Sequence, residues 1–215
     1  MTFEQILLDR LAGFIYITDA QASALQAHYE LLVRWNARIN LTAIRTMEEV
    51  VVRHYCESLF LGRKLAAPSG CTVFDLGSGA GFPGIPLAVL RPDWQVTLIE
   101  SHKRKAVFLR EAARGLSNVK VIDQRAEDVN GPCDWLVSRA VRPADVLAQG
   151  RKLSKCIGLL VGEADLKDCL GAGDITWKDP VKLPWGENTF VLTGGFHVEF
   201  LARVDGPSPR VDGPG

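Results

Sequence analysis

The sequence lacks three features that assign many chains to a class at once: an excess of one charge, a long apolar run and a paired set of cysteines. Its 25 Lys and Arg residues balance 25 Asp and Glu residues, so any nucleic-acid contact must rest on a local basic patch. No apolar run approaches the ~20 residues of a membrane span, and no charged-then-apolar leader opens the sequence. We therefore expect a cytoplasmic protein with no membrane partner.

The cysteines argue against both a disulfide framework and a metal centre. They are odd in number and scattered, without the short spacings of metal ligands, at Cys56, Cys71, Cys133, Cys156 and Cys169. This usage is typical of reduced thiols in a cytosolic protein. A chain of 215 residues can bury a sizeable core as a single compact domain, and we expect a monomer without a metal.

The most informative segment is a glycine-rich turn that follows a short apolar run. Residues 72–76 contain one acidic residue, Asp75, and lead into Gly77-x-Gly79-x-Gly81. A helix is predicted from about Pro83, because proline fits the first turn of a helix. Strand, glycine turn and helix in this order are typical of the first unit of a Rossmann-like sheet, where a ligand approaches the backbone closely. The turn therefore predicts a nucleotide-like cofactor.

Two cofactors fit the glycines in two different frames. Gly79-x-Gly81-x-x-Gly84 matches the dinucleotide fingerprint, in which a helix N-terminus holds a pyrophosphate. The frame that begins at Gly77 starts directly at the strand end and suits S-adenosylmethionine, whose amino group needs a carboxylate such as Asp75. The Tyr-x-x-x-Lys pair of many nicotinamide enzymes is also missing from the sequence. The methyl donor is favoured; a nicotinamide-dependent oxidoreductase and a non-catalytic RNA-binding module remain as alternatives.

The remaining pattern predicts an α/β fold. Residues 1–66 form an N-terminal helical extension, with capping boxes at Thr18–Gln21 and Thr46–Glu49. A core at 67–204 follows, and the Pro- and Gly-rich residues 205–215 form a flexible tail. Alternation of strands and helices predicts a mostly parallel sheet covered on both faces. The strands are expected at 72–76, 95–100, 118–122, 134–138 and 156–161, the helices at 86–91, 103–115 and 143–153, and an antiparallel edge hairpin at 175–178 and 188–203.

Acidic residues follow the next two predicted strands. Glu100 closes the second strand about 20 residues beyond the glycine turn, where a carboxylate accepts hydrogen bonds from ribose hydroxyls. Ala126 and Glu127 follow the third strand, near the expected position of an adenine. A solvated rim carboxylate is the alternative for Glu100, and a favourable charge at a helix N-terminus is the alternative for neighbouring Asp128.

The end of the fourth predicted strand indicates which acceptor is methylated. The Asn/Asp-Pro-Pro-aromatic run of amino-directed methyltransferases is missing there, and Cys133 lies at the wrong end of the strand to act as a nucleophile. A ring nitrogen with an exposed lone pair, such as guanine N7, needs neither a base nor a covalent intermediate. In-line positioning suffices, and we expect Arg139 to supply it as the catalytic residue.

Basic residues outside this edge form the expected RNA-binding set. Phosphate contacts are predicted for Arg34, Arg38, Arg53, His54, Lys103 and Arg104. The alternative is an ordinary solvated face for the Lys and Arg residues, and a hydrogen-bonded structural role for His54.

Several segments together resemble one family. They are Trp35-Asn36 to Ile44, Arg53-His54 with Ser58-Leu59, residues 75–86 (DLGSGAGFPGIP), Lys105-x-x-Phe108-Leu109 and Ser138-Arg139-Ala140. Residues 20–162 thereby resemble the bacterial guanine-N7 methyltransferases of 16S ribosomal RNA, first called glucose-inhibited division protein B. The resemblance implies a Rossmann-like fold, S-adenosylmethionine as cofactor, and 16S ribosomal RNA or the small ribosomal subunit as partner. It also implies donor contacts at Gly77, Phe82, Ala126, Glu127 and Arg139.

Two positions depart from the family pattern. Glu57 stands where the family usually has Asp, and Leu160-Val161-Gly162-Glu163 lacks the lysine of the family's Leu-Lys-Gly-like segment. If that lysine contacts RNA in relatives, this chain must contact RNA by other residues.

Overall fold

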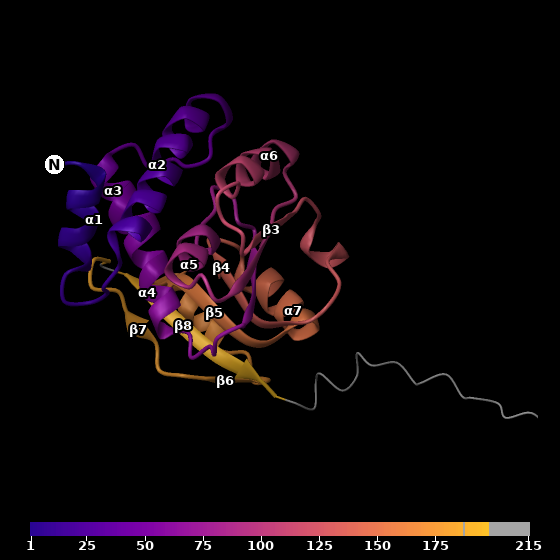
Figure 1. Cartoon of the computed structure of the whole chain (residues 1–215). Coiled ribbons are helices and arrows are strands. Elements are labelled where there is room, and N and C mark those ends of the chain that lie inside the picture. Colours follow the sequence, from indigo (N-terminus) through magenta and orange to yellow (C-terminus); the bar gives the residue numbers. More distant parts are fainter. Residues whose placement is uncertain (187, 198–215) are drawn as a thin grey trace, which may run out of the picture.

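The computed structural model describes residues 1–186 and 188–197. Its N-terminal part is the predicted helical extension, gathered on one side of the molecule (Figure 1). It contains α1 (Phe3–Leu11), α2 (Asp19–Ile39) and a continuous helical rod formed by α3 (Met47–Val50), η1 (Val51–Cys56) and α4 (Glu57–Lys64). The predicted tail at 205–215 and the end of the predicted hairpin at 198–203 lie outside the described residues.

The helix boundaries follow local side-chain chemistry. Thr18 caps α2 with the predicted capping box to Gln21, and the Thr46 side chain accepts from the Glu49 N–H at the start of α3. Asn40 ends α2 in the left-handed conformation at φ 42° and ψ 62°, which asparagine tolerates better than most residues. The sequence did not predict that η1 is a π-helix, a wider turn found frequently at functional sites.

Within the described residues, eight strands form one sheet in the order β3-β2-β1-β4-β5-β8-β6, with β7 paired to β8. The first five are parallel neighbours, and β8 runs antiparallel to β5 and β6. Their bounds are β1 (Thr72–Leu76), β2 (Gln95–Ile99), β3 (Val119–Ile122), β4 (Cys133–Arg139), β5 (Ser154–Gly162), β6 (Ile175–Trp177), β7 (Val181–Lys182) and β8 (Thr189–Phe196). The predicted parallel sheet is confirmed. The predicted antiparallel edge hairpin is confirmed as well: β6 pairs antiparallel with β8, and β8 lies between β5 and β6.

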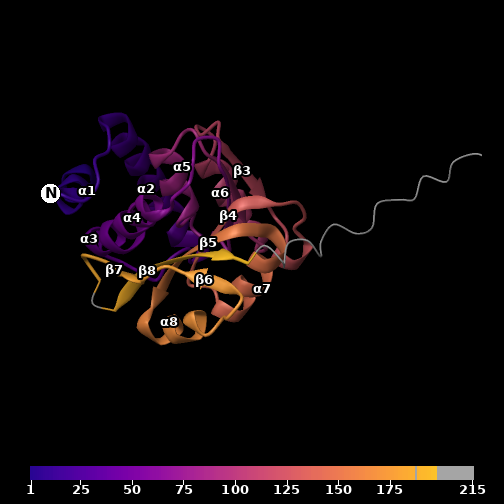
Figure 2. The same cartoon turned by 90° about the horizontal axis from the view of Figure 1, so that it is seen from below.

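Helices cover both faces of this sheet (Figures 1 and 2). Alternate residues of β4 belong to two separate cores: Val137 faces the core shared with the helical extension, and Leu136 faces the other. The first core also takes residues of α5 (Gly84–Leu90) and α6 (Lys103–Ala112), and the second takes residues of α7 (Pro143–Leu153) and α8 (Glu163–Leu170). The helix α8 was not predicted. No helix in the described part of the chain is long and apolar enough to cross a membrane.

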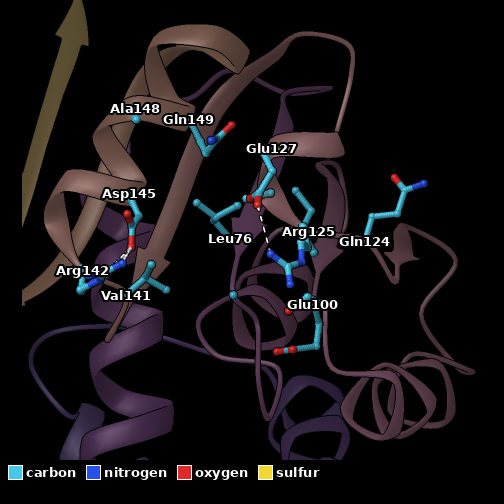
Figure 3. A pocket seen from close by; sticks show the side chains of 14 residues that line it. Leu76, Glu100, Gln124, Arg125, Glu127, Val141, Arg142, Asp145, Ala148 and Gln149 are labelled. Carbon is cyan, nitrogen blue, oxygen red and sulfur yellow. Dashed lines mark hydrogen bonds and ion pairs between the residues drawn. The ribbon is translucent and has the colours of Figure 1, made fainter.

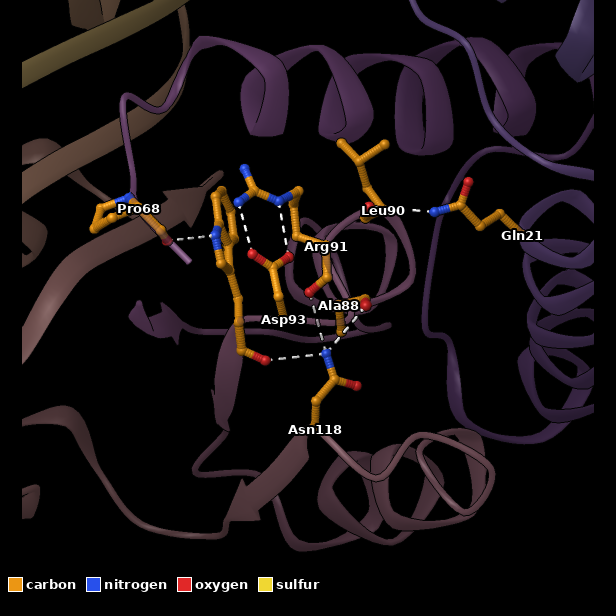
Figure 4. A network of polar contacts seen from close by, with 8 residues as sticks. Gln21, Pro68, Ala88, Leu90, Arg91, Asp93 and Asn118 are labelled. Carbon is orange, nitrogen blue, oxygen red and sulfur yellow. Dashed lines mark hydrogen bonds and ion pairs between the residues drawn. The ribbon is translucent and has the colours of Figure 1, made fainter. Parts of the chain in front are cut away.

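The amino end of the sheet is closed by a network of satisfied polar groups (Figure 4). The Asn118 amide donates to the carbonyls of Ala88, Arg91 and Trp94, at 3.1, 3.3 and 3.1 Å. The Trp94 indole donates to the Pro68 carbonyl at 3.1 Å. These bonds join the segments that precede β1, β2 and β3, so they fix the strands from the end opposite the glycine turn.

The strand order places a crevice at the other end. The chain leaves β1 toward β2 and β3 on one side and returns to add β4 on the other side. Such a reversal separates the loops at the carboxyl ends of the two central strands, and open α/β sheets bind their ligands there.

Candidate functional site at the carboxyl ends of the parallel strands

A cavity of about 440 Å³ lies at the carboxyl ends of β1, β2 and β3. Its volume falls within the range of roughly 300–1,000 Å³ that small-molecule sites occupy. The loops that follow β1, β2, β3 and β4 line it together with one face of α7 (Figure 3). The lining residues are Leu76, Gly77, Ile99, Glu100, Ser101, Gln124, Arg125, Ala126, Glu127, Val141, Arg142, Asp145, Ala148 and Gln149. Four residues predicted to bind the cofactor are therefore brought together: Gly77, Glu100, Ala126 and Glu127.

Glu100 links the end of β2 to the glycine turn. Its carboxylate accepts from the Gly79 N–H at 2.9 Å and from the His102 N–H at 2.7 Å, one bond to each oxygen. The side chain is 8% exposed and lines the cavity. Because a carboxylate oxygen has more than one acceptor site, both oxygens can still accept a hydroxyl from a ligand.

The glycines of the turn leave room that a side chain would fill. Gly77 has φ +72°, and a Cβ there would stand 2.7 Å from Val141 Cγ2. Gly79 has φ +56°, and only the Gly77 carbonyl lies within 4 Å of a built Cβ, at 3.7 Å, so the side of Gly79 where a Cβ would stand is open. Left-handed backbone at both positions explains why the turn needs glycine.

Asp75 does not reach the cavity. It is fully buried on β1, and its Oδ2 accepts from the Gly84 N–H at 2.9 Å. Burial raises its pKa to about 7, opposed by the Gly84 hydrogen bond. In this structure Asp75 anchors the start of α5 from beneath the turn, and its contact with a ligand amino group stays a prediction.

The same contacts decide what the N-terminus of α5 can bind. The Gly84 N–H is taken by Asp75, the Ile85 N–H donates to the Gly81 carbonyl at 2.8 Å, and Pro86 has no N–H. A pyrophosphate needs several such donors at a helix N-terminus. The first three residues of α5 offer none, so the dinucleotide frame of the glycines lacks its phosphate site.

One wall of the cavity comes from α7 and was missed in the sequence. Asp145 and Gln149 lie on one face of this helix (Figure 3), and Arg142, the residue at its N-cap position, pairs with Asp145 at 2.8 Å. Their spacing of three and four residues is the available signal, since it places side chains on the same helix face. On the opposite wall, Arg125 lies 3.6 Å from the exposed Glu127 carboxylate.

Arg139 closes β4 but points toward the helical extension. Its guanidinium lies 3.2 Å from the carboxylate of Glu57, and it also contacts His54 Nδ1. It is not among the residues that line the cavity. The next residue, Ala140, has φ +59°, a left-handed conformation that is strained for alanine and clusters at functional sites.

Two further expected donor contacts lie away from the cavity. Phe82 is 5% exposed and stacks on the His54 ring, with centroids 4.5 Å apart. Gly81 has φ +90°, and a Cβ there would meet Ile85 at 2.5 Å. Both residues shape and pack the turn in this structure, and their contacts with the donor stay predictions.

The expected RNA-binding residues divide in two. Arg34, Arg38, Arg53, Lys103 and Arg104 are exposed, and Trp35 joins α2 to α6 through a 3.1 Å bond to Glu111. The Lys103 ammonium lies 3.5 Å from Asp123. His54 differs: its ring is half-buried and both nitrogens have protein partners. These internal hydrogen bonds favour the structural alternative for His54, and its RNA contact stays a prediction.

Cys133 is buried at the amino end of β4, as expected for a core residue. Burial raises the pKa of its thiol to about 12, so it is not an activated nucleophile. Within residues 1–186 and 188–197, no cluster of three or more His, Cys, Asp or Glu side chains could hold a metal ion.

The strand order, the helices on both faces and the glycine turn define a Rossmann-like methyltransferase fold. A solved structure of an S-adenosylmethionine-dependent methyltransferase from Aquifex aeolicus shares it, with a TM-score of 0.58 and 16% identity over 69% of this chain and 93% of that chain. A putative RNA methyltransferase from Pyrococcus horikoshii is similar at a TM-score of 0.56 and 14% identity, over 80% of this chain and 100% of that chain.

Comparison with a family model identifies the family. The family model for rRNA small subunit methyltransferase G (GidB) matches residues 21–161, and this chain belongs to that family. Ribosomal RNA small subunit methyltransferase G of Desulforamulus reducens is 40% identical over 62% of this chain and 59% of its own length. The protein of that name from Nitrosomonas europaea is 45% identical over 57% of this chain and 58% of its own length. The chain thus spans about three fifths of the length of these curated relatives.

Proposed function

We propose that this protein transfers a methyl group from S-adenosylmethionine to N7 of a guanine in 16S ribosomal RNA. The observation that carries the proposal is the cavity at the carboxyl ends of β1–β3 in a chain of this family. Two features bear on the cofactor: an acidic residue closes β2, and the start of α5 has no N–H groups for a phosphate.

The cavity fits a donor with a ribose and no phosphate. Glu100 would accept the ribose hydroxyls, and the Gly77–Gly79 backbone would lie against the methionine part of the donor. Ala126 and Glu127 would lie near the adenine, with the α7 face closing the far side. Bound S-adenosylmethionine supplies a methyl group on a positively charged sulfur.

The acceptor step needs alignment rather than acid–base chemistry. The N7 lone pair forms the new bond to the methyl carbon as the carbon–sulfur bond breaks, and the bonding electrons go to sulfur. Guanine N7 carries no proton, so no base is required, and the transfer is accelerated by holding both partners in line.

Arg139 is the residue we assign to positioning. A guanidinium N–H can donate to guanine O6, which lies beside N7, and leaves the N7 lone pair free to attack. The place of Arg139 at the end of β4, the strand beside β1, and next to the strained Ala140 supports this assignment. A guanidinium stays protonated at neutral pH, so Arg139 orients the donor, the base or both.

The RNA would approach over the exposed basic residues of α2 and α6. Arg34, Arg38, Lys103 and Arg104 supply local charge in a protein with equal numbers of charged residues of each sign. The segment 160–163, at the end of β5 and the start of α8, lacks the lysine that the family usually has there, so this segment is not expected to contribute that charge. Ribosomal RNA as substrate would place the protein in the cytoplasm.

The decisive experiment compares 16S ribosomal RNA from cells with and without this protein by mass spectrometry. Loss of one N7-methylguanosine, restored by the wild-type gene, is expected. Calorimetry with the purified protein should give binding of S-adenosylhomocysteine and none of NAD at the same concentration. Unchanged RNA together with tight NAD binding would support the oxidoreductase, and unchanged RNA with neither ligand bound would support a non-catalytic RNA-binding module.

A further inference from the structure

We propose that Glu57 and His54 are positioning residues that hold the Arg139 guanidinium at the carboxyl end of β4. The inference rests on the proposed methyl transfer, and it assigns a function to the helical extension in that reaction. Neither residue lines the cavity, so both act through Arg139.

The first contact is a buried ion pair. Glu57 Oε2 lies 3.2 Å from an Arg139 nitrogen, and the two side chains are 2% and 14% exposed. Burial raises the pKa of Glu57, and Arg139 opposes that rise; burial lowers the pKa of Arg139, and Glu57 opposes that fall. Each side chain is therefore the countercharge that keeps the other ionised away from water.

The ion pair leaves hydrogen-bonding capacity unused. Glu57 Oε2 has no hydrogen-bond partner among the described residues, because the 3.2 Å contact lacks hydrogen-bond geometry. A buried acceptor without a donor is costly, and such groups in native structures often mark functional sites. The ion pair therefore restricts the position of the Arg139 guanidinium, and its energetic cost indicates a role beyond packing of the core.

The second contact fixes the other side of the guanidinium. His54 Nδ1 contacts an Arg139 nitrogen, while Nε2 lies 2.8 Å from the Thr42 hydroxyl. Burial lowers the pKa of His54 to about 3, with help from the charges of Arg139 and Arg53. The neutral ring accepts from Arg139 at Nδ1 and donates to Thr42 at Nε2, since a neutral imidazole has one donor and one acceptor.

The surroundings of His54 leave its ring little freedom. It stacks on Phe82 of the glycine turn at 4.5 Å, with the planes 15° apart. Thr42 is itself held by Asn36, through bonds of 3.0 and 2.9 Å. Arg139 is thereby tied to α2, to the rod that begins at α3 and to the glycine turn at once.

The π-helix η1 places the two groups. His54 lies within η1, and Glu57 begins the regular α4 directly after it. A π-turn re-aims the side chains that follow it, and such turns are frequent at functional sites. Here the side chains of His54 and Glu57 both contact the guanidinium of Arg139 at the end of β4.

The test measures single-turnover methyl transfer to 16S ribosomal RNA by Glu57→Gln and Arg139→Ala singly and together. Glu57→Gln should slow transfer by roughly tenfold to a hundredfold, as small misplacement does in a proximity-driven reaction. The double variant should be no slower than Arg139→Ala, because Glu57 acts through Arg139. Asp174→Asn is the matched control: it breaks the Arg151–Asp174 pair, with bonds of 2.5 and 2.8 Å outside the cavity, and should leave the rate unchanged.

Variants of His54 test the same proposal if the Glu57 variant does not fold. His54→Asn keeps an acceptor near the Nδ1 position and should retain more of the rate than His54→Leu. A readout independent of activity is the nitrogen NMR signal of His54, which should show an unprotonated, hydrogen-bonded Nδ1 that changes in Arg139→Ala.

The outcomes separate the two proposals. If the wild type transfers methyl and both Glu57→Gln and His54→Leu match its rate per folded molecule, the positioning role is wrong. It is also wrong if Glu57→Gln slows the Arg139→Ala background as much as it slows the wild type. If the wild type itself transfers no methyl, the proposed function fails, and the NMR signal still tests the His54–Arg139 contact.

Discussion

The two ends of the parallel sheet differ in how completely their polar groups are satisfied. At the amino end, Asn118, Trp94 and the Arg91–Asp93 pair all have partners within hydrogen-bonding distance (Figure 4). Of the four buried side-chain atoms without a hydrogen-bond partner in the described part of the chain, three lie at the carboxyl end: Glu57 Oε2, Asp75 Oδ1 and Gln149 Oε1. The amino end is built for stability, whereas the carboxyl end accepts unsatisfied groups at a site for a ligand.

Backbone conformation repeats this contrast. Gly77, Gly79, Gly81 and Ala140 all have positive φ at the carboxyl end. At the amino end, Gly70 has φ +75°, with nothing within 4 Å of a built Cβ, and it does not line the 440 Å³ cavity. Glycine adopts positive φ without strain, but a substituted side chain there is strained, so equal substitutions at the two ends separate the cost of strain from the loss of function.

The largest expected effect is that of Gly79→Val on donor binding. A branched side chain at φ +56° both strains the turn and fills the side from which the donor would approach. Affinity for S-adenosylhomocysteine should fall more than a hundredfold in calorimetry, while the circular dichroism spectrum is retained. Gly70→Val carries a similar backbone cost, on the order of 1–2 kcal/mol, and should bind normally. Equal loss in both variants would mean that strain alone explains the effect.

Next in size is Arg139→Lys, which keeps the charge but loses the planar fork. The transfer rate should fall about tenfold to a thousandfold. Between pH 6 and 9 the wild-type rate should show no ionisation of a catalytic base, because guanine N7 has no proton to lose. A rate in Arg139→Ala equal to the wild type would make Arg139 structural and move the acceptor site elsewhere along this edge.

A smaller effect is expected in the pH dependence of the unfolding free energy, which should differ between carboxylates at the two ends of the sheet. Asp75 has a folded-state pKa of about 7 against an ordinary value of 3.8, so between pH 4 and 7 the folded state holds a proton that the unfolded state has lost. The unfolding free energy should therefore fall as pH rises through this window, by about 4 kcal/mol at most. Denaturant titrations of Asp75→Asn should lack this fall.

Asp134, at the amino end, is the matched control with the opposite sign. Hydrogen bonds from the Thr72 N–H and hydroxyl hold its pKa below the ordinary value. Its stabilisation is present above pH 4 and is lost as pH falls further. Asp134→Asn should thus lower stability and leave the pH 4–7 slope intact. The same slope in wild type and Asp75→Asn would show that Asp75 is already ionised in the folded state.

The smallest expected effect concerns the exposed basic residues. Each phosphate-contacting charge removed from Lys103 and Arg104 should flatten the dependence of log affinity on log salt by roughly 0.7–0.9. Lys152 and Lys155, beside the amino end of β5, provide the control pair and should leave the slope unchanged in filter-binding assays. An unchanged slope after removal of both charges would mean that Lys103 and Arg104 are ordinary solvent-exposed residues that do not contact RNA.

The sequence alone determined the elements whose signals are local. The glycine turn, the capping residues Thr18 and Thr46 and the alternation of apolar strands with helices predicted the parallel sheet, because each depends on neighbours within a few positions. The position of Glu100 at the end of β2 followed from the same strand–turn–helix spacing. The family resemblance rested on these local motifs as well.

Only the tertiary structure decided which groups face the ligand and which face the protein. Asp75 and Phe82 are next to the turn in sequence, yet one supports α5 and the other packs on His54. Arg139 meets Glu57 across 82 positions of the chain, a contact that depends on how the helical extension packs on the sheet. Side-chain direction at the end of a strand is set by burial and by distant partners, and the sequence carries no local signal for either.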